Sequence, residues 1–196
     1  EVIVVDNNSQ DNSCQKIKEQ YPQVKLIENK RNFGFAQANN QGAQIAQSDI
    51  LFFLNPDTII PDVNLFNKAM RVFEDNPQTA IVGFKIFFNS GKEQPWTYGK
   101  RITQSPGTQS LTWVSGAGLM IRKNVFEKVN FDINLKRSED YDLWFQIIGK
   151  KFKIAYLPGI AYYYKMHASQ KSKNKEEMKK AARYINQKLK EGVYFR

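Results

Sequence analysis

The sequence has few of the residues that build metal centres and covalent cross-links. It contains one cysteine, Cys14, and one histidine, His167, in 196 residues. A single cysteine cannot form a disulfide within the chain, and these counts exclude zinc sites built from several cysteines or histidines. No apolar run approaches the roughly 18 residues of a membrane-spanning helix, and no signal peptide is visible. We therefore expect a protein of a reducing, cytoplasmic compartment.

The composition indicates a folded domain with an anionic partner. Hydrophobic residues make up 41% of the chain and aromatic residues 13%, which is enough to bury a sizeable core. Lys and Arg total 29 against 19 acidic residues, so the net charge is +10. This excess favours binding to a nucleotide, a nucleic acid or an acidic membrane surface, and the charge alone does not choose among them.

Predicted strands and helices alternate along most of the chain. Apolar, β-branched runs predict strands at residues 2–5, 24–29, 50–54 and 80–88, followed by later strands at 153–159 and 161–165. Helical spacing predicts helices at residues 14–20, 36–47, 61–73, 138–149 and 171–190, and a short strand with a helix after it at 113–129. Residues 89–109 are polar and rich in Gly and Pro, which predicts a long loop. The pattern predicts an α/β fold with an open, mostly parallel sheet flanked by helices.

Two carboxylates directly follow predicted strands. Asp6 ends "EVIVVD", and Asp57 ends "LFFLNPD". Ligands of open α/β sheets bind at the carboxyl ends of strands, so either residue is a candidate ligand of a divalent cation or a nucleotide. Asn-Pro-Asp is also good turn chemistry, and the residues after Asp6 resemble a helix-capping region. Both interpretations stay open from local sequence alone.

Other candidate residues lie in loops and at helix starts. Asn32, Gly34 and Asn39 sit where a loop enters a helix, which suits either turn and capping chemistry or a phosphate contact. "SGAG" at residues 115–118 lacks the pattern of a phosphate-binding P-loop, so its small residues more simply let a substrate or backbone approach closely.

"RSEDYDLW" places acidic residues in the first turn of a predicted helix, with Ser138 as its N-cap. The helix dipole favours carboxylates there, and Glu139 and Asp140 are also candidates for catalysis. His167 is a lone histidine, which is more often structural than a ligand. The basic helix at 171–190 is either a solvated surface or a contact with an anionic membrane or a diphosphate.

The order of these segments is more specific than any one of them. "VIVVDNNSQDNS", "NKRNFGFAQANNQGAQIAQSDILFFLNPDT", "VSGAGLMIRKNVFEKVNFD" and "SEDYDLWFQIIGKK", then a histidine closely followed by a serine, resemble the family 2 glycosyltransferases, in particular their rhamnosyltransferase-like branch. The resemblance runs to about residue 172. It implies a GT-A fold over residues 1–170, followed by a basic helical tail at 171–196.

The resemblance implies an inverting, metal-dependent glycosyltransferase that moves a sugar from a nucleotide diphosphate donor to an acceptor hydroxyl, in cell-surface polysaccharide or glycan synthesis. By position, Asp6 corresponds to the carboxylate that recognises the nucleoside base. The residues that would border the nucleotide, the donor sugar and the acceptor are Asn32, Gly34, Asn39, Gly116 and Ala117.

The same resemblance assigns the reacting groups. Asn55-Pro56-Asp57 matches the family's Asp-x-Asp-type motif, with Asp57 expected to hold Mg²⁺ or Mn²⁺. His167 matches a late histidine that approaches the metal or the diphosphate. Asp140 resembles the catalytic base, and Glu139 beside it would orient the acceptor. An inverting transfer needs both functions, because the attacking hydroxyl must lose a proton while negative charge builds on the leaving diphosphate.

Three departures from the family pattern bear on this interpretation. Asn55 replaces the first Asp of the metal motif, which leaves Asp57 as its strong carboxylate. The family's first strand is absent before Glu1, and we expect activity to depend on it. The Gln-x-x-Arg-Trp signature of processive synthases is also absent, which favours an enzyme that adds one sugar at a time.

Two other functions fit parts of the sequence. A nucleotidyltransferase also uses a metal and a nucleotide on a similar sheet, and a non-catalytic basic module would bind nucleotides or nucleic acid through the charge of +10. The charge is spread widely and no nucleic-acid motif is present, so we expect no nucleic-acid partner. The expected partners are a nucleotide-sugar donor, a glycan or lipid-linked acceptor, and the anionic inner face of the cell membrane.

Overall fold

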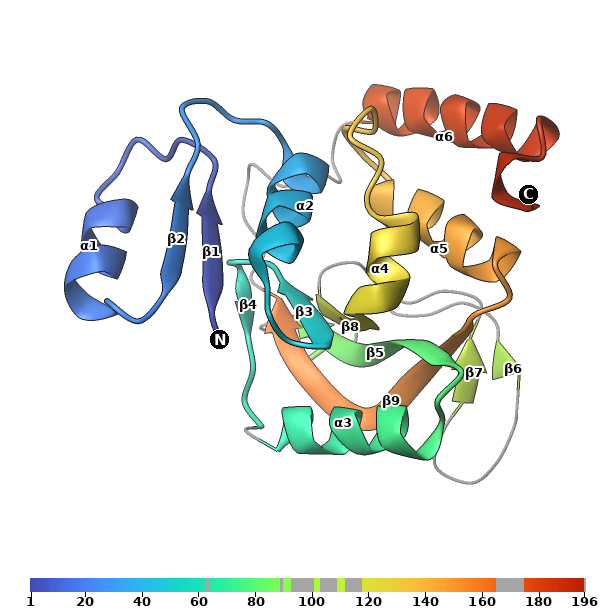
Figure 1. Cartoon of the computed structure of the whole chain (residues 1–196), viewed down its shortest axis with the longest axis horizontal. Helices are drawn as coiled ribbons and strands as arrows, with labels where there is room; N and C mark the ends of the chain where they lie inside the picture. Colours follow the sequence, from blue (N-terminus) through green and yellow to red (C-terminus); the bar gives the residue numbers. More distant parts are fainter. Residues whose placement is uncertain are drawn as a thin grey trace.

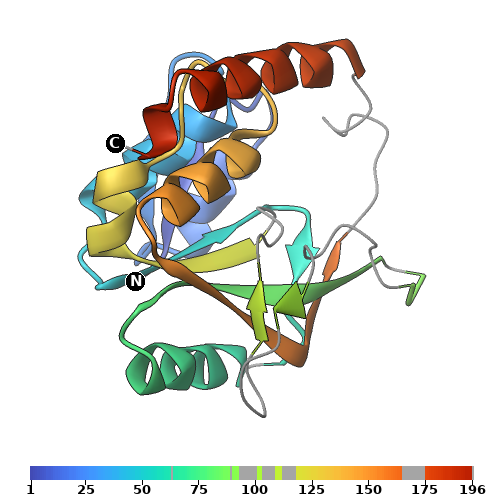
Figure 2. The same ribbon diagram turned by 90° about the vertical axis from the view of Figure 1, so that its right-hand side faces the viewer.

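The structure, a computed structural model, describes residues 1–62, 64–88, 90–92, 101–102, 109–111, 118–164 and 175–195. Its strands are β1 (Ile3–Asp6), β2 (Lys25–Glu28), β3 (Ile50–Leu54), β4 (Thr58–Ile59), β5 (Thr79–Phe88), β6 (Arg101–Ile102), β7 (Gln109–Leu111), β8 (Gly118–Arg122) and β9 (Lys153–Tyr164). Its helices are α1 (Ser13–Gln20), α2 (Phe35–Ile45), α3 (Leu65–Asp75), α4 (Lys123–Val129), α5 (Glu139–Gly149), α6 (Lys175–Lys190) and the 3₁₀ helix η2 (Val193–Phe195). Helices α2, α4, α5 and α6 lie on one side of the larger sheet and α3 lies on the other (Figure 1; Figure 2).

The strands form two sheets. β1 and β2 pair in parallel, while the seven-stranded sheet has the order β3-β8-β5-β9-β7-β6, with β4 paired to β9. Within the described part of this larger sheet, only β5 and β9 run parallel. The predicted α/β architecture with helices around an open sheet is confirmed, but the sheet is mixed rather than mostly parallel. A continuous apolar run indicates that a strand is buried on both faces of the sheet. It does not indicate which other strand will pair with it.

β1 and β3 begin side by side. The Glu1 carboxylate accepts hydrogen bonds from the backbone amides of Gln47 and Ser48, just before β3. In the described residues β1 pairs only with β2, and β3 pairs only with β8, so each keeps one open edge.

The core has one layer on each face of the larger sheet. Alternating strand residues supply both layers: Leu51 and Phe53 face the layer beneath α4 and α5, while Phe52 packs toward α3. The ring of Phe53 lies 4.8 Å from the ring of Phe126 and 5.3 Å from that of Phe131. These contacts hold α4 and the segment after it against the sheet.

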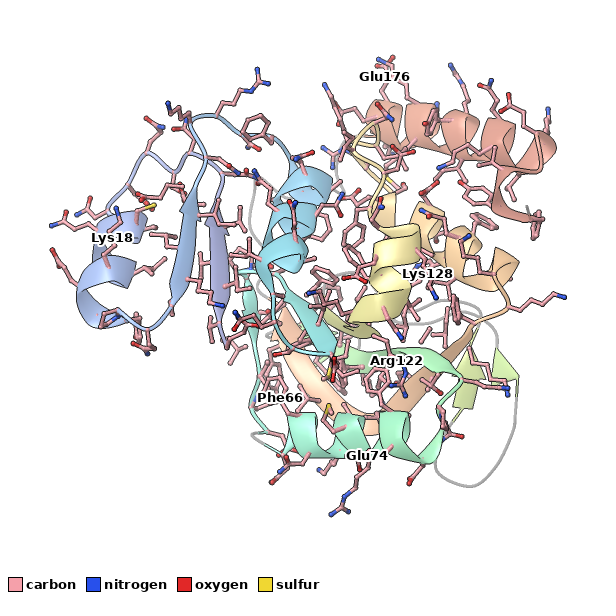
Figure 3. The ribbon with its side chains drawn as sticks, in the orientation of Figure 1. Lys18, Phe66, Glu74, Arg122, Lys128 and Glu176 are labelled. Atoms are coloured by element: carbon pink, nitrogen blue, oxygen red, sulfur yellow. The ribbon has the colours of Figure 1, made fainter. Side chains whose placement is uncertain are left out.

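Arg122 ties the end of β8 to α3. Its Nε donates to the Thr79 carbonyl at 2.9 Å and its Nη2 to the Phe73 carbonyl at 2.6 Å. The guanidinium carbon also lies 5.0 Å from the centre of the Phe73 ring. Figure 3 shows this side chain between the strands and α3. The contact satisfies carbonyls where α3 ends and β5 begins.

Three predicted boundaries were wrong. The helix predicted from residue 61 begins at Leu65, and β6 lies inside the predicted loop 89–109, most of which lies outside the described residues. The two predicted late strands are one strand, β9. Phe84 pairs with Leu157 and the next residue, Lys85, pairs with Ala161, so the residues between them on β9 form a bulge. Pairing with β5 carries β9 past a Pro-Gly sequence that locally predicts a break.

The predicted C-terminal helix is confirmed as α6, and it packs against the rest of the fold. Ala181 and Ile185 are buried against Leu135, and Tyr194 of η2 joins the same cluster. Across the described residues, no helix is both long and apolar enough to cross a bilayer. The division into residues 1–170 and 171–196 stays a prediction.

Candidate functional site

Asp6 is the last residue of β1 and so places a carboxylate at a strand end, as predicted. Its Oδ2 accepts a hydrogen bond from the Ser9 backbone amide at 3.0 Å. Partial burial acts to raise the pKa of Asp6, but hydrogen bonds from the side chain and backbone of Ser9 outweigh it, so the pKa lies below its ordinary value. Asp6 is therefore ionised at neutral pH and able to accept hydrogen bonds from a ligand.

An amide network connects the ends of β1 and β2 to α2. Asn7 Nδ2 donates to the Gly34 carbonyl at 3.1 Å, and Asn29 Nδ2 donates to Asn7 Oδ1 at 2.9 Å. Asn29 and Gln41 exchange two further hydrogen bonds of 2.8 and 3.0 Å. The sequence prediction missed Asn7, Asn29 and Gln41, although an Asn at or close to the end of each of the first two predicted strands was an available signal. The network fixes the loops in which ligands of such sheets bind.

Gly34 is required by the backbone at the start of α2. Its φ is +89°, and its amide donates to Asn32 Oδ1 at 2.9 Å. The structure thus brings Asn32 and Gly34 beside Asn7, which follows Asp6. Asn39 lies further along α2, where its Nδ2 donates to the Phe35 carbonyl of the same helix at 2.8 Å.

Asp57 lies in the turn predicted from Asn-Pro-Asp. The Thr58 amide donates to the Asn55 carbonyl at 3.2 Å, and the Thr58 hydroxyl donates to the same oxygen. The turn prediction is confirmed, and Asp57 is half-buried within it. Among the described residues, no three carboxylates, histidines or cysteines gather where they could hold a metal ion.

Strand pairing brings the start of β8 and the end of β9 beside this turn. Leu54, just before the turn, pairs with Gly118, and Thr58, at its end, pairs with Tyr164. Gly116, Ala117 and His167 themselves lie outside the described residues. The described residues that lie beside the Asp57 turn are therefore Gly118 at the start of β8 and Tyr164 at the end of β9.

Glu139 and Asp140 are the first two residues of α5. Ser138 is the N-cap residue, as predicted, but its side chain makes no capping hydrogen bond and its φ is +56°. A left-handed conformation at a residue other than Gly is strained and needs support from its surroundings. Asp140 Oδ1 accepts a hydrogen bond from the Tyr141 amide at 3.0 Å. The half-buried carboxylates of Glu139 and Asp140 thus directly follow a residue with a left-handed backbone.

Sequence comparison identifies relatives of the chain. Residues 1–130 match the family model described as "Glycosyl transferase family 2". Over 175 residues, or 85% of its length, the chain is 25% identical to the "Minor teichoic acid biosynthesis protein GgaB" of Bacillus subtilis. It spans only 19% of that protein.

Structure comparison finds the same fold in glycosyltransferase structures. The fold is similar to S. aureus TarS 1-349 in complex with UDP-GlcNAc, with a TM-score of 0.74 and 19% identity over 94% of this chain and 56% of that one. It is also similar to GalNAc-T7 with UDP, GalNAc and Mn²⁺, with a TM-score of 0.69 and 16% identity over 86% and 38% of the two chains. These likenesses confirm the predicted GT-A fold. None of the three proteins named here is described as a rhamnosyltransferase, so that branch stays a prediction.

Proposed function

The chain belongs to glycosyl transferase family 2, and we propose that it moves a sugar from a nucleoside diphosphate donor to an acceptor hydroxyl with inversion. The observation that carries the proposal is the pairing around turn 55–58, which sets Gly118 and Tyr164 beside the turn that holds Asp57. A donor diphosphate at Asp57 would lie at the strand ends where the fold binds ligands. Glu139 and Asp140 would then serve the acceptor.

The donor side is supported by the loops after β1 and β2. Asp6 is ionised and would accept hydrogen bonds from a nucleoside base or ribose. Asn32 and Gly34 would border the nucleotide at the start of α2, and Asn39 one turn further along. TarS and GalNAc-T7 are described with UDP or UDP-GlcNAc, so a UDP-sugar is the first donor to test.

A divalent cation fits the chemistry of the residues at turn 55–58. Asp57 offers the carboxylate oxygens that Mg²⁺ and Mn²⁺ prefer, and Tyr164, three residues before His167 in the sequence, pairs with Thr58 at the end of the turn. With Asn55 at the first motif position, Asp57 and His167 would be the protein ligands, and diphosphate oxygens would complete the set. When bound, the cation would offset the negative charge on the leaving diphosphate.

Asp140 would act as the base for the acceptor. It lies at the start of α5, where the helix dipole favours the ionised carboxylate that must receive the proton. Glu139 beside it would hydrogen-bond the acceptor and orient its hydroxyl for attack. The base and the diphosphate site come from separate parts of the chain, as a transfer between two substrates requires.

Binding of UDP provides the direct test. The chain is expected to bind UDP in the presence of Mn²⁺, and Asp57→Ala is expected to weaken that binding at least about tenfold, because it removes the carboxylate that holds the cation. Calorimetric titration with and without EDTA measures both effects. Asp75→Ala, which removes an exposed carboxylate at the end of α3, is the matched control and should bind normally. UDP affinity that is unchanged by EDTA and by Asp57→Ala would contradict the metal site.

We also propose that the acceptor is a glycan or a lipid-linked glycan at the inner face of the cell membrane. The name of GgaB connects a relative to teichoic acid biosynthesis, which supports a role in cell-surface polysaccharide synthesis. The exposed side of α6 opposite Ala181 and Ile185 carries cations at helical spacing: Lys175, Lys179, Arg183 and Lys190. Such a row suits an anionic lipid surface.

Vesicle binding tests this surface. The chain is expected to sediment with phosphatidylglycerol vesicles at low salt and to be released by high salt. Lys179→Glu with Arg183→Glu should weaken binding by well over tenfold, since each cation near an anionic surface contributes about 1 kcal/mol. Lys16→Glu with Arg71→Glu makes the same change in net charge on α1 and α3, and this pair should bind more tightly than the α6 variant. Equal loss in both pairs would mean that net charge alone is responsible.

A further inference from the structure

The C-terminal helix is attached to the part of the fold that carries the proposed base. Leu135, Ala181, Ile185 and Tyr194 are all at most 5% exposed, and together they form a small apolar cluster. The rings of Phe145 in α5 and Tyr194 in η2 lie 5.4 Å apart. α6 therefore rests on α5 and on the segment that leads into it, as Figure 2 shows.

A buried carboxylate connects α6 and η2 to the first turn of α5. Asp142 is fully buried, and its Oδ1 accepts hydrogen bonds from Lys188 Nζ and the Tyr194 hydroxyl. Its Oδ2 accepts from Gln146 Nε2 at 2.7 Å. Lys188 also donates to Asp132 Oδ2 at 3.1 Å. A buried carboxylate is stable only when it is paired and hydrogen-bonded. These contacts therefore fix α5 at Asp142, two residues after Asp140.

A second contact from α6 lies on the N-terminal side of residues 138–141, the turn that begins α5. Arg137 Nε donates to Glu177 Oε2 at 2.8 Å, and the Arg137 side chain is only 13% exposed. Arg137 Nη1 is buried without a hydrogen-bond partner among the described residues. Glu177 therefore supplies the counter-charge that keeps this guanidinium in place, three residues before Asp140.

We infer that α6 is a clamp on the catalytic turn, in which Glu177 acts through Arg137 as a positioning residue for Glu139 and Asp140. The two contacts flank residues 138–141, and Ser138 between them is held at a φ of +56°. A strained residue keeps its conformation only while the structure on both sides constrains it. Without the Glu177 contact, Ser138 is free to relax, and the carboxylates move with it. The inference rests on the proposed role of Asp140.

The test compares Glu177→Ala with Glu176→Ala in the full chain. Glu176 is exposed and lies in the first turn of α6 (Figure 3), so its loss removes the same charge and leaves the Arg137 contact intact. With UDP-GlcNAc and Mn²⁺ as the probe, Glu177→Ala should lower kcat for hydrolysis about tenfold to a hundredfold. The KM and the affinity for UDP with Mn²⁺ should match those of Glu176→Ala, while the urea midpoint should fall modestly because the nearly buried Arg137 loses its partner. This split between kcat and affinity is the result that a merely structural role would not produce.

A double-mutant cycle shows whether the effect passes through Arg137. Arg137→Ala combined with Glu177→Ala should lose no more activity than either single variant, because both changes break one contact. Equal kcat in the Glu177 and Glu176 variants would overturn the inference. A parallel fall in kcat, UDP affinity and urea midpoint would also overturn it, since that pattern means general destabilisation. Asp140→Asn separates the two proposals: full turnover in that variant overturns the proposed base itself, whereas lost turnover there with a normal Glu177→Ala overturns only the clamp.

Discussion

Replacing Asp140 with asparagine is expected to lower the rate of sugar transfer by about 10²- to 10⁴-fold, the usual contribution of a general base. Asparagine has nearly the same shape as aspartate but cannot take a proton from the attacking hydroxyl. The side-chain oxygen of asparagine can still accept the hydrogen bond that Tyr141 donates to Asp140, so the turn before α5 should survive. Release of UDP from UDP-GlcNAc in the presence of Mn²⁺ measures the rate.

The asparagine variant should bind UDP as the unmodified chain does, because Asp140 serves the acceptor and Asp57 the donor diphosphate. Asp75→Asn, at the exposed end of α3, controls for the loss of one negative charge. A rate within twofold of the unmodified chain would contradict the assignment of Asp140 as the base. Loss of UDP binding in Asp140→Asn would instead place this residue on the donor side.

Replacing Gly149 with alanine is expected to destabilise the protein by about 2 to 4 kcal/mol, from overpacking together with a weakened hydrogen bond to a buried charge. A Cβ at this position would lie 1.7 Å from the carbonyl oxygen of Tyr194 and 2.7 Å from its carbonyl carbon. Both are backbone atoms, so η2 must move to make room. Movement of η2 also pulls the Tyr194 hydroxyl from Asp142. Urea unfolding measures the loss, and faster proteolysis of α6 should accompany it.

Gly42→Ala is the matched control, since Gly42 also lies in a helix. A Cβ there meets Val5 Cγ2 at 3.4 Å, an ordinary contact, and alanine is favoured over glycine inside helices by about 1 kcal/mol. This variant should be as stable as the unmodified chain or more so. If both alanine variants unfold at the same urea concentration, the close approach of Tyr194 to Gly149 is not a constraint on the fold.

Local sequence was sufficient for the features that depend on residue type and nearest neighbours. Apolar β-branched runs predicted β1 and β3, and the carboxylates that follow them, Asp6 and Asp57, lie at strand ends as expected. Pro56 sets the backbone of its turn through its own ring, so that turn was also predictable. The order of the motifs was enough to identify the family, because it preserves residue types at matching positions.

Contacts between distant residues could not be predicted in this way. The helix predicted at residues 138–149 ends at Gly149 as expected, but the left-handed residue after α5 is Lys151, and a glycine is needed at 149 because the Tyr194 backbone approaches it. Asp142 and Asp140 are two residues apart in one acidic stretch, and only tertiary packing makes Asp142 a buried partner of Lys188.

The sequence by itself determined the α/β architecture, the family and the candidate carboxylates of this protein, because periodicity, turn chemistry and motif order are local properties of the chain. Tertiary structure alone decided the mixed order of the sheet, the pairing of Gly118 and Tyr164 beside the Asp57 turn, and the contact of α6 with the turn before α5. These depend on which surfaces meet when the chain folds. Which surfaces come together is determined by burial and strand pairing over many residues, and the local sequence pattern does not contain that information.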